Sequence, residues 1–145
     1  MALYRLIYKS ISTQPFTTEF LQSLEESSKE NNAALEVTGI LIGTKSAFLQ
    51  VLEGERKNVN LVFEKICQDS RHTEIELISY DRIFQREFPD WSMKCLSTGI
   101  MSRIVSNFFK NKYGEKDSDV DLPVDGDKAF ALLFDLAYLQ KTGEI

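Results

Sequence analysis

The chain has 145 residues, of which 43% are hydrophobic and 27% charged, the size and balance of one globular domain that needs no metal or disulfide to fold. Its net charge of −5 argues against nucleic acid and against an anionic membrane surface as direct partners. We expect a cytoplasmic protein, because the N-terminal residues lack the pattern of a signal peptide and no apolar run approaches the roughly 20 residues of a membrane span. The two cysteines, Cys67 and Cys95, form no CxxC motif, so we interpret both as reduced thiols.

Alternating strand and helix patterns fill the chain up to about residue 97. Aromatic and β-branched residues predict the strands, and an N-cap at Thr17 or Thr18 followed by Phe20, Leu21 and Leu24 on one face predicts the first helix. The order β-α-β-β-α-β with one further strand predicts an α+β, ferredoxin-like sheet that carries both helices on one face. The expected elements are a strand at 3–8, a helix from about 18 to 31, strands at 37–43 and 47–53, a helix at 55–68, and strands at 74–83 and 91–97.

After Gly99 the pattern becomes helical. Residues 101–112 are predicted to form one helix, 113–128 an acidic loop, and 129–139 a strongly apolar helix. We divide the chain into a domain at 1–98 and a C-terminal helical extension at 99–145 within the same compact unit. The two C-terminal helices are expected to cover the second sheet face and also to form a self-association or partner surface. The alternative is that the last helix only completes the core of a monomer.

One polar side chain lies among core residues in the strand at 47–53. Because strand side chains alternate, Gln50 shares its face with Phe48 and Leu52. Burial of an amide without a partner costs about 1–3 kcal/mol, so some group must hydrogen-bond Gln50. A backbone group, a core hydroxyl and a ligand all remain open.

The first helix changes character in the same way toward its end. Helical spacing carries its apolar face from Leu24 to Ser28 and then to Asn31 and Asn32. The two asparagines either cap the helix or offer their amides to an imide-like ring edge, which alternates C=O and N–H groups.

Aromatic and sulfur side chains give weaker signals when each is taken alone. Tyr8 is typical of a core tyrosine with one satisfied hydroxyl. Trp91, Met93 and Cys95 are expected to share one face of the strand at 91–97, a stripe more typical of a core than of a cofactor site.

Together these residues resemble the BLUF family, the sensors of blue light using FAD. The resemblance covers about residues 3–93 and depends on the order and spacing of its motifs, with Gln50 following Tyr8 by 42 positions. The short tail without an effector domain resembles the stand-alone PixD-like subgroup. The motifs are LYRLIY with Tyr8, the pair Asn31 and Asn32, TGILI, FLQVLEGE with Gln50, Asp69-Ser70-Arg71-His72 and Trp91-Ser92-Met93.

The resemblance implies that FAD is held between the two helices. Asn31 and Asn32 would bind the pyrimidine carbonyls and N3–H of the flavin, and Gln50 would bridge Tyr8 and the N5/O4 edge. The other implied contacts are Arg71 and His72 beside the ring or the ribityl chain, Ser28 in the pocket, and Leu24, Phe48 and Ile66 as apolar walls.

The resemblance also implies photochemistry without turnover of a substrate, so we expect no enzyme. Tyr8 would donate an electron and then a proton to the excited flavin, and Gln50 would rotate or tautomerise. The strand that carries Trp91 and Met93 would relay the change outward. We expect a homo-oligomer that signals to a partner protein through the C-terminal helices.

Two other functions fit a ferredoxin-like fold. A binding module for another small ligand or for a protein would need no photochemistry. An acylphosphatase-like enzyme would need a glycine-rich phosphate loop in its first turn, where this chain has SISTQPF. A nucleophilic pair of Cys67 and His72 would lack an orienting third group, and a single histidine gives no support for a metal site.

Overall fold

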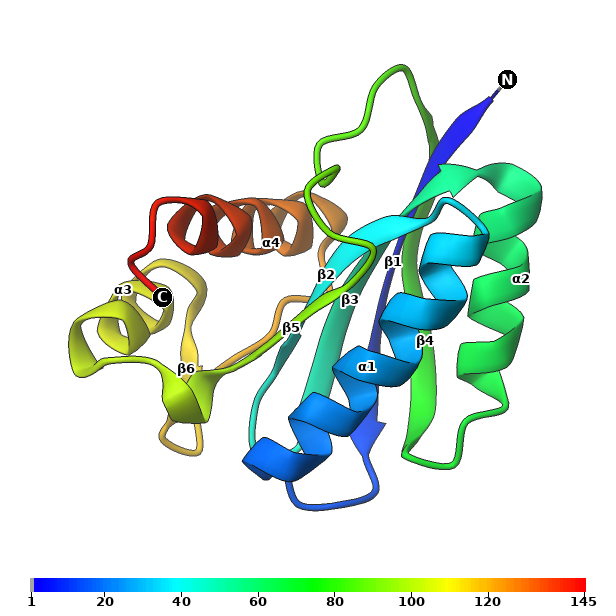
Figure 1. Ribbon diagram of the computed structural model, residues 1–145. Helices are drawn as coiled ribbons and strands as arrows, with labels where there is room; N and C mark the ends of the chain where they lie inside the picture. The colour runs from blue at the N-terminus through cyan, green and yellow to red at the C-terminus, as the bar shows by residue number, and fades with distance from the viewer. Residues whose placement is uncertain (1) are drawn as a thin grey trace.

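The structure, a computed structural model, describes residues 2–145, and Figure 1 shows a twisted sheet with helices on both sides. The strands are β1 Leu3–Ser12, β2 Thr38–Gly43, β3 Ala47–Glu55, β4 His72–Ile83, β5 Lys94–Ser97, β6 Glu115–Lys116 and β7 Asp119–Val120. The helices are α1 Thr18–Ala34, α2 Arg56–Cys67, α3 Arg103–Tyr113 and α4 Gly126–Lys141, with one 3-10 turn, η1, at Thr98–Ile100.

The main sheet has the strand order β4-β1-β3-β2-β5. Its pairs are antiparallel except for β2 and β5, which run parallel. Helices α1 and α2 lie side by side over one face, and α4 lies on the other (Figure 1). The predicted ferredoxin-like arrangement, with an extra strand and two C-terminal helices, is therefore confirmed.

Strand alternation divides the buried side chains between the two faces of the sheet. Tyr8, Phe48 and Leu52 belong to the core beneath α1 and α2. Ile7, Leu49 and other aliphatic residues belong to the core beneath α4. The polar side chain of Gln50 falls on the α1 and α2 side, as its place in the alternation predicts.

Helix α1 begins as predicted and ends later than predicted. The hydroxyl of Thr17 accepts a hydrogen bond from the backbone N–H of Phe20, which fixes the N-cap. The helix continues to Ala34, and Glu36 then turns the chain with a φ of 52°. Asn32 therefore lies inside the helix, and the capping alternative for this residue is wrong.

The predicted strand at 91–97 is wrong over its first residues, because β5 begins only at Lys94. The chain bends at Ser92, so the alternation of side chains does not extend back to Trp91. Met93 and Cys95 are buried on the side of α1, whereas Trp91 packs against the core beneath α4. The expectation that these three side chains share one face is wrong for Trp91.

The predicted acidic loop at 113–128 contains a small hairpin. Strands β6 and β7 pair in antiparallel fashion, and Asp117 and Ser118 between them have φ values of 52° and 65°. Two successive positive φ values are typical of a tight type I′ hairpin turn, which single-residue composition did not reveal. Helix α4 also begins earlier than predicted, at Gly126.

The apolar helix α4 covers the second sheet face, as predicted, whereas α3, for which the same was predicted, packs mainly against α4 and β7. Leu132, Leu133 and Leu136 are fully buried in the core that α4 shares with the sheet. Phe134 and Tyr138 lie on its outer side and are 43% and 57% exposed. Within the described residues, none of the helices has the length and apolar character needed to cross a membrane.

Candidate functional site

A cleft lies above the sheet between α1 and α2. Its two adjoining parts share Ser28, Gln50, Ile66, Asp69 and Arg71. All of the residues that the sequence predicts as cofactor contacts line it, together with Tyr8. They are Leu24, Ser28, Asn31, Asn32, Phe48, Gln50, Ile66, Arg71 and His72.

A short hydrogen-bonded chain crosses the floor of the cleft. The pairing of β1 with β3 sets Tyr8 opposite Gln50, and the Tyr8 hydroxyl donates to Oε1 of Gln50. Nε2 of Gln50 donates to the sulfur of Met93 at 3.2 Å. A core hydroxyl is therefore one partner of Gln50, and the amide keeps a second donor and a second acceptor site for another group.

Tyr8 is held in its neutral form. Only 2% of its surface is exposed, and burial raises the pKa of its hydroxyl well above the ordinary value near 10. The negative form of the nearby Cys95 would raise this pKa further. The phenol therefore keeps its proton and can donate to Gln50 over the whole physiological pH range.

Asn32 connects the helix with the segment before β5. The residue is 2% exposed, and its Nδ2 donates to the carbonyl of Ser92 at 3.0 Å. An amide has one more donor and one more acceptor to offer to a ligand in the cleft. Asn31 is an exposed residue and lines only one of the two parts of the cleft.

An ion pair between Asp69 and Arg71 lines both parts of the cleft. Nε of Arg71 lies 3.0 Å from each carboxylate oxygen of Asp69, and Nη2 lies 2.5 Å from Oδ2. These hydrogen bonds from Arg71 lower the pKa of Asp69 and raise that of Arg71. Sequence reasoning quoted Asp69 as part of a motif but missed it as a site residue, and it missed Ser27, Leu41, Val62 and Lys65, which also line the cleft.

Both ring nitrogens of His72 bond to the protein itself. Nε2 lies 2.6 Å from the carbonyl oxygen of Ile66, which can only accept, so Nε2 carries a proton. Nδ1 then accepts from the hydroxyl of Ser10 at 2.8 Å. The imidazole ring makes T-shaped contacts with the rings of Tyr8 and Phe48, with centroids 6.0 and 5.8 Å away. His72 therefore offers a cofactor ring contact rather than a hydrogen bond.

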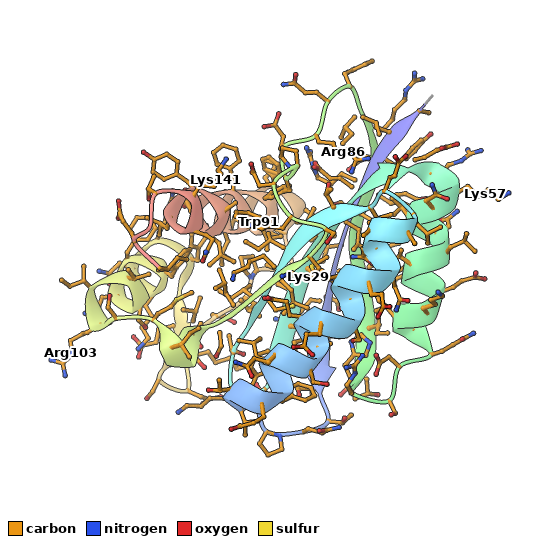
Figure 2. All side chains as sticks on the ribbon, in the orientation of Figure 1. Lys29, Lys57, Arg86, Trp91, Arg103 and Lys141 are labelled. Atoms are coloured by element: carbon orange, nitrogen blue, oxygen red, sulfur yellow. The ribbon has the colours of Figure 1, made fainter. Side chains whose placement is uncertain are left out.

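Trp91 is the predicted site residue that the fold keeps away from the cleft. Figure 2 shows its side chain before β5, on the side of α4. Its backbone carbonyl accepts from the N–H of Gly39, which holds this stretch against β2. Met93 also lies outside the cleft lining, but it touches the site through its bond to Gln50.

The chemistry of the cleft suits a flat heteroaromatic ring with an imide edge. Amides from Asn32 and Gln50 offer donors and acceptors side by side, and apolar side chains such as Leu24 and Ile66 form the walls. Among residues 2–145 there is no cluster of histidine, cysteine and carboxylate side chains that could hold a metal ion.

Comparison with known proteins agrees with this chemistry. A family model described as "Sensors of blue-light using FAD" matches residues 3–94. The photoactivated adenylate cyclase subunit beta of Euglena longa is 32% identical over 92 residues, which cover 63% of this chain and 11% of that protein. The blue light- and temperature-regulated antirepressor BluF of Escherichia coli (strain K12) is 30% identical over 101 residues, covering 70% of this chain and 25% of that protein.

Solved structures extend the similarity to the C-terminal helices. The dark-state structure of BlrB, a BLUF protein, has a TM-score of 0.76 and 28% sequence identity, and covers 94% of this chain and 96% of its own. The chain spans only a small part of the curated relatives above but nearly all of this structure. From its motif spacing, its fold and the family match over residues 3–94, the chain belongs to the BLUF family of blue-light sensors.

Proposed function

We propose that this chain is a blue-light photoreceptor that binds FAD in the cleft between α1 and α2. The observation that carries the proposal is the chain of hydrogen bonds from Tyr8 through Gln50 to Met93 at the floor of that cleft. It joins an oxidisable phenol to a reorientable amide and then to the segment that leads into β5. Names of relatives such as a photoactivated cyclase and a blue light-regulated antirepressor support a sensory role.

The residues of the cleft fit the cofactor in chemical type. Asn32, with Asn31 at the rim, would bind the imide edge of the flavin, because amides match alternating C=O and N–H groups. Gln50 would offer its free donor and acceptor sites to the ring beside Tyr8. Ser28 and Arg71 would complete the polar contacts, His72 would contact the ring, and Leu24, Phe48 and Ile66 would form the walls.

The protein's part in the photochemistry lies in Tyr8 and Gln50. Bound flavin would supply the absorption of blue light and an acceptor for one electron. Tyr8 is the proposed donor of that electron and of its phenolic proton, which the structure keeps on the hydroxyl by burial. If the Gln50 amide turns by half a rotation, Nε2 faces the Tyr8 oxygen and Oε1 faces the sulfur of Met93. Met93 then loses its donor, so the state of the amide reaches the segment before β5.

A light-minus-dark absorption spectrum of FAD-loaded protein tests the proposal. The wild type should show a small, reversible red shift. Tyr8→Phe and Gln50→Leu should retain flavin, because the asparagines and apolar walls persist, and should lose the shift. Tyr4→Phe is the matched control, since Tyr4 lies on the same strand outside the cleft and packs on Tyr80. A normal photocycle in Tyr8→Phe, or a colourless wild type produced with ample FAD, would refute the proposal.

The proposed output is a protein contact rather than turnover of a substrate. Phe134 and Tyr138 on α4 and Ile104 on α3 are exposed apolar side chains, typical of a contact surface. Phe88 packs edge-on against Phe130 of α4 at 5.7 Å between centroids, which joins the segment before β5 to this helix. We therefore keep 1–98 as the sensory unit and 99–145 as the extension through which the chain self-associates and signals to a partner protein.

A further inference from the structure

Helix α1 holds the segment that leads into β5 at two points. Oε2 of Glu25 accepts a hydrogen bond from the backbone N–H of Cys95 at 2.8 Å. Nδ2 of Asn32 donates to the carbonyl of Ser92 at 3.0 Å. Met93 lies between these two bonds, and its sulfur accepts from Gln50. The residue that contacts the switch glutamine is thus fixed on both sides by one helix.

The spacing of the two bonds fits both elements. Glu25 and Asn32 are seven positions apart in α1, which is about 10.5 Å along a helix axis. Ser92 and Cys95 are three positions apart, and three residues of chain span at most about 10 Å. The two spans are of similar size, and both bonds form from one straight helix.

The bond to Glu25 compensates for a weak position in the sheet. Strand β5 has only the residues Lys94–Ser97, lies at an edge, and pairs with β2 alone. Cys95 is a buried residue, so its N–H would have no partner in this register without the carboxylate. Lys29, one turn further along α1, places its Nζ 3.5 Å from the other oxygen of Glu25, and Figure 2 shows it on the helix next to β5.

We propose that Glu25 is a positioning residue of the light switch, one that fixes β5 in the register in which Met93 meets Gln50. The inference rests on the proposed function, because it assigns Glu25 a role in the same Tyr8–Gln50 switch. In the register of β5 that the structure shows, which we assign to the dark state and call the dark register, the Glu25 carboxylate accepts a hydrogen bond from the Cys95 N–H. Without it, that N–H can find a partner only in water, which requires β5 to move away from α1. Loss of Glu25 therefore destabilises the dark register relative to the displaced one.

If β5 is displaced in the light state, the predicted consequence is a longer-lived light state. Glu25→Ala should slow thermal recovery in the dark by about 10- to 150-fold, the equivalent of one hydrogen bond to a charged group. Glu25→Gln keeps an acceptor oxygen and should recover close to the wild-type rate. Glu26→Ala removes the same charge from the next position of the helix and should leave recovery unchanged. Alanine is a good helix former, so α1 should persist in both alanine variants.

Amide hydrogen exchange supplies the second measurement. Exchange of the Cys95 N–H, followed by NMR on FAD-loaded protein kept in the dark, should be faster in Glu25→Ala than in wild type, and should be restored in Glu25→Gln. If Glu25 only stabilised the fold, the exchange of the Cys95 N–H and the rate of dark recovery would not change together in Glu25→Ala and return together in Glu25→Gln.

The two possible failures are distinguishable. If the wild type shows no light-induced shift, the proposed function fails, whatever the exchange rates are. If the wild type does photocycle and Glu25→Ala matches it in both recovery and Cys95 exchange, the positioning role of Glu25 is overturned. That role is also overturned if Glu26→Ala slows recovery as much as Glu25→Ala, because the effect would then be one of surface charge.

Discussion

The bond between Tyr8 and Gln50 predicts a strong coupling between two substitutions, independent of light. Tyr8 and Gln50 are 2% and 3% exposed, so neither side chain can replace its partner with bulk water. Tyr8→Phe leaves Oε1 of Gln50 without its donor, and Gln50→Leu leaves the Tyr8 hydroxyl without its acceptor. The double variant removes both polar groups and leaves an apolar pair of similar shape.

The expected magnitudes follow from the cost of unpaired buried groups. Each single variant should lose about 1–3 kcal/mol of unfolding free energy. At an unfolding entropy of roughly 2.1 cal/mol/K per residue, this corresponds to a fall in Tm of about 3–10 °C for a chain of this length. The double variant should lie close to the wild type, because replacing both partners of a buried bond is nearly neutral.

Urea-induced unfolding of the four cofactor-free proteins, followed by circular dichroism, measures the coupling. The single losses should not add, and the double variant should recover most of the stability. Additive losses in the double variant, or singles that unfold like the wild type, would show that the Tyr8–Gln50 bond contributes nothing to the folded state.

Four further outcomes follow from the site and from α4. Asn32→Ala should weaken FAD binding by roughly 5- to 150-fold, since it leaves buried groups unpaired, and unchanged affinity in an FAD titration would contradict this. The light-induced shift should keep its amplitude from pH 7 to 10, because burial holds the pKa of Tyr8 well above 10; a fall with a midpoint below 10 would contradict it. The stabilisation from Asp69, whose pKa Arg71 lowers, is fully present above the ordinary carboxyl pKa near 4, and FAD retention should decline only below that pH. Phe134→Glu should convert a wild type of higher mass into a folded, yellow monomer by light scattering; a monomeric wild type would exclude self-association.

The choice of Phe134 in the last of these experiments depends on the structure, because the helical pattern does not show which apolar residues of α4 are exposed. Leu133 and Phe134 are neighbours in one strongly apolar helix, and the pattern makes both equally suitable for testing an interface. In the structure Leu133 is fully buried against the sheet, whereas Phe134 is partly exposed. The sequence shows that the apolar arc is wide, but only the packing of α4 shows which part of the arc faces the core.

The core of the site was predictable because it depends on strand alternation. Counting residues in the strand placed Gln50 among core side chains, the family resemblance paired it with Tyr8, and the antiparallel pairing of β1 with β3 makes the two direct neighbours. Trp91 was misplaced for the same reason, because the counting assumed a regular strand where the chain bends at Ser92. Asp69 was missed because an acidic residue in a loop is usually solvated; its pairing with Arg71, two positions away, is local, and the tertiary fold places this pair at the cleft.

Strand alternation predicts the face of the sheet to which Glu53 points, but not the contacts that its buried carboxylate makes. Three positions after Gln50, it points to the opposite face, where its side chain is fully buried. The register sets Arg5 opposite it, and Nε of Arg5 donates to Oε2 at 2.8 Å. Oε1 accepts from the backbone N–H of Phe88 at 2.7 Å, while the Arg5 guanidinium lies 4.6 Å over the ring of Phe130 on α4.

These bonds determine how far a change at Met93 can travel. Separating a buried carboxylate from its partners costs about 3–5 kcal/mol, so the chain at Phe88 is fastened to β3 much more firmly than Met93 is fastened to Gln50. As long as the bonds to Glu53 hold, a shift that begins at Met93 therefore cannot pass back toward the N-terminus beyond residue 89. If Phe88 moves, its contact with Phe130 moves too, and α4 must adjust. The strength of the Glu53 contacts, rather than the proximity of α4 to the cleft, decides which of these two outcomes occurs.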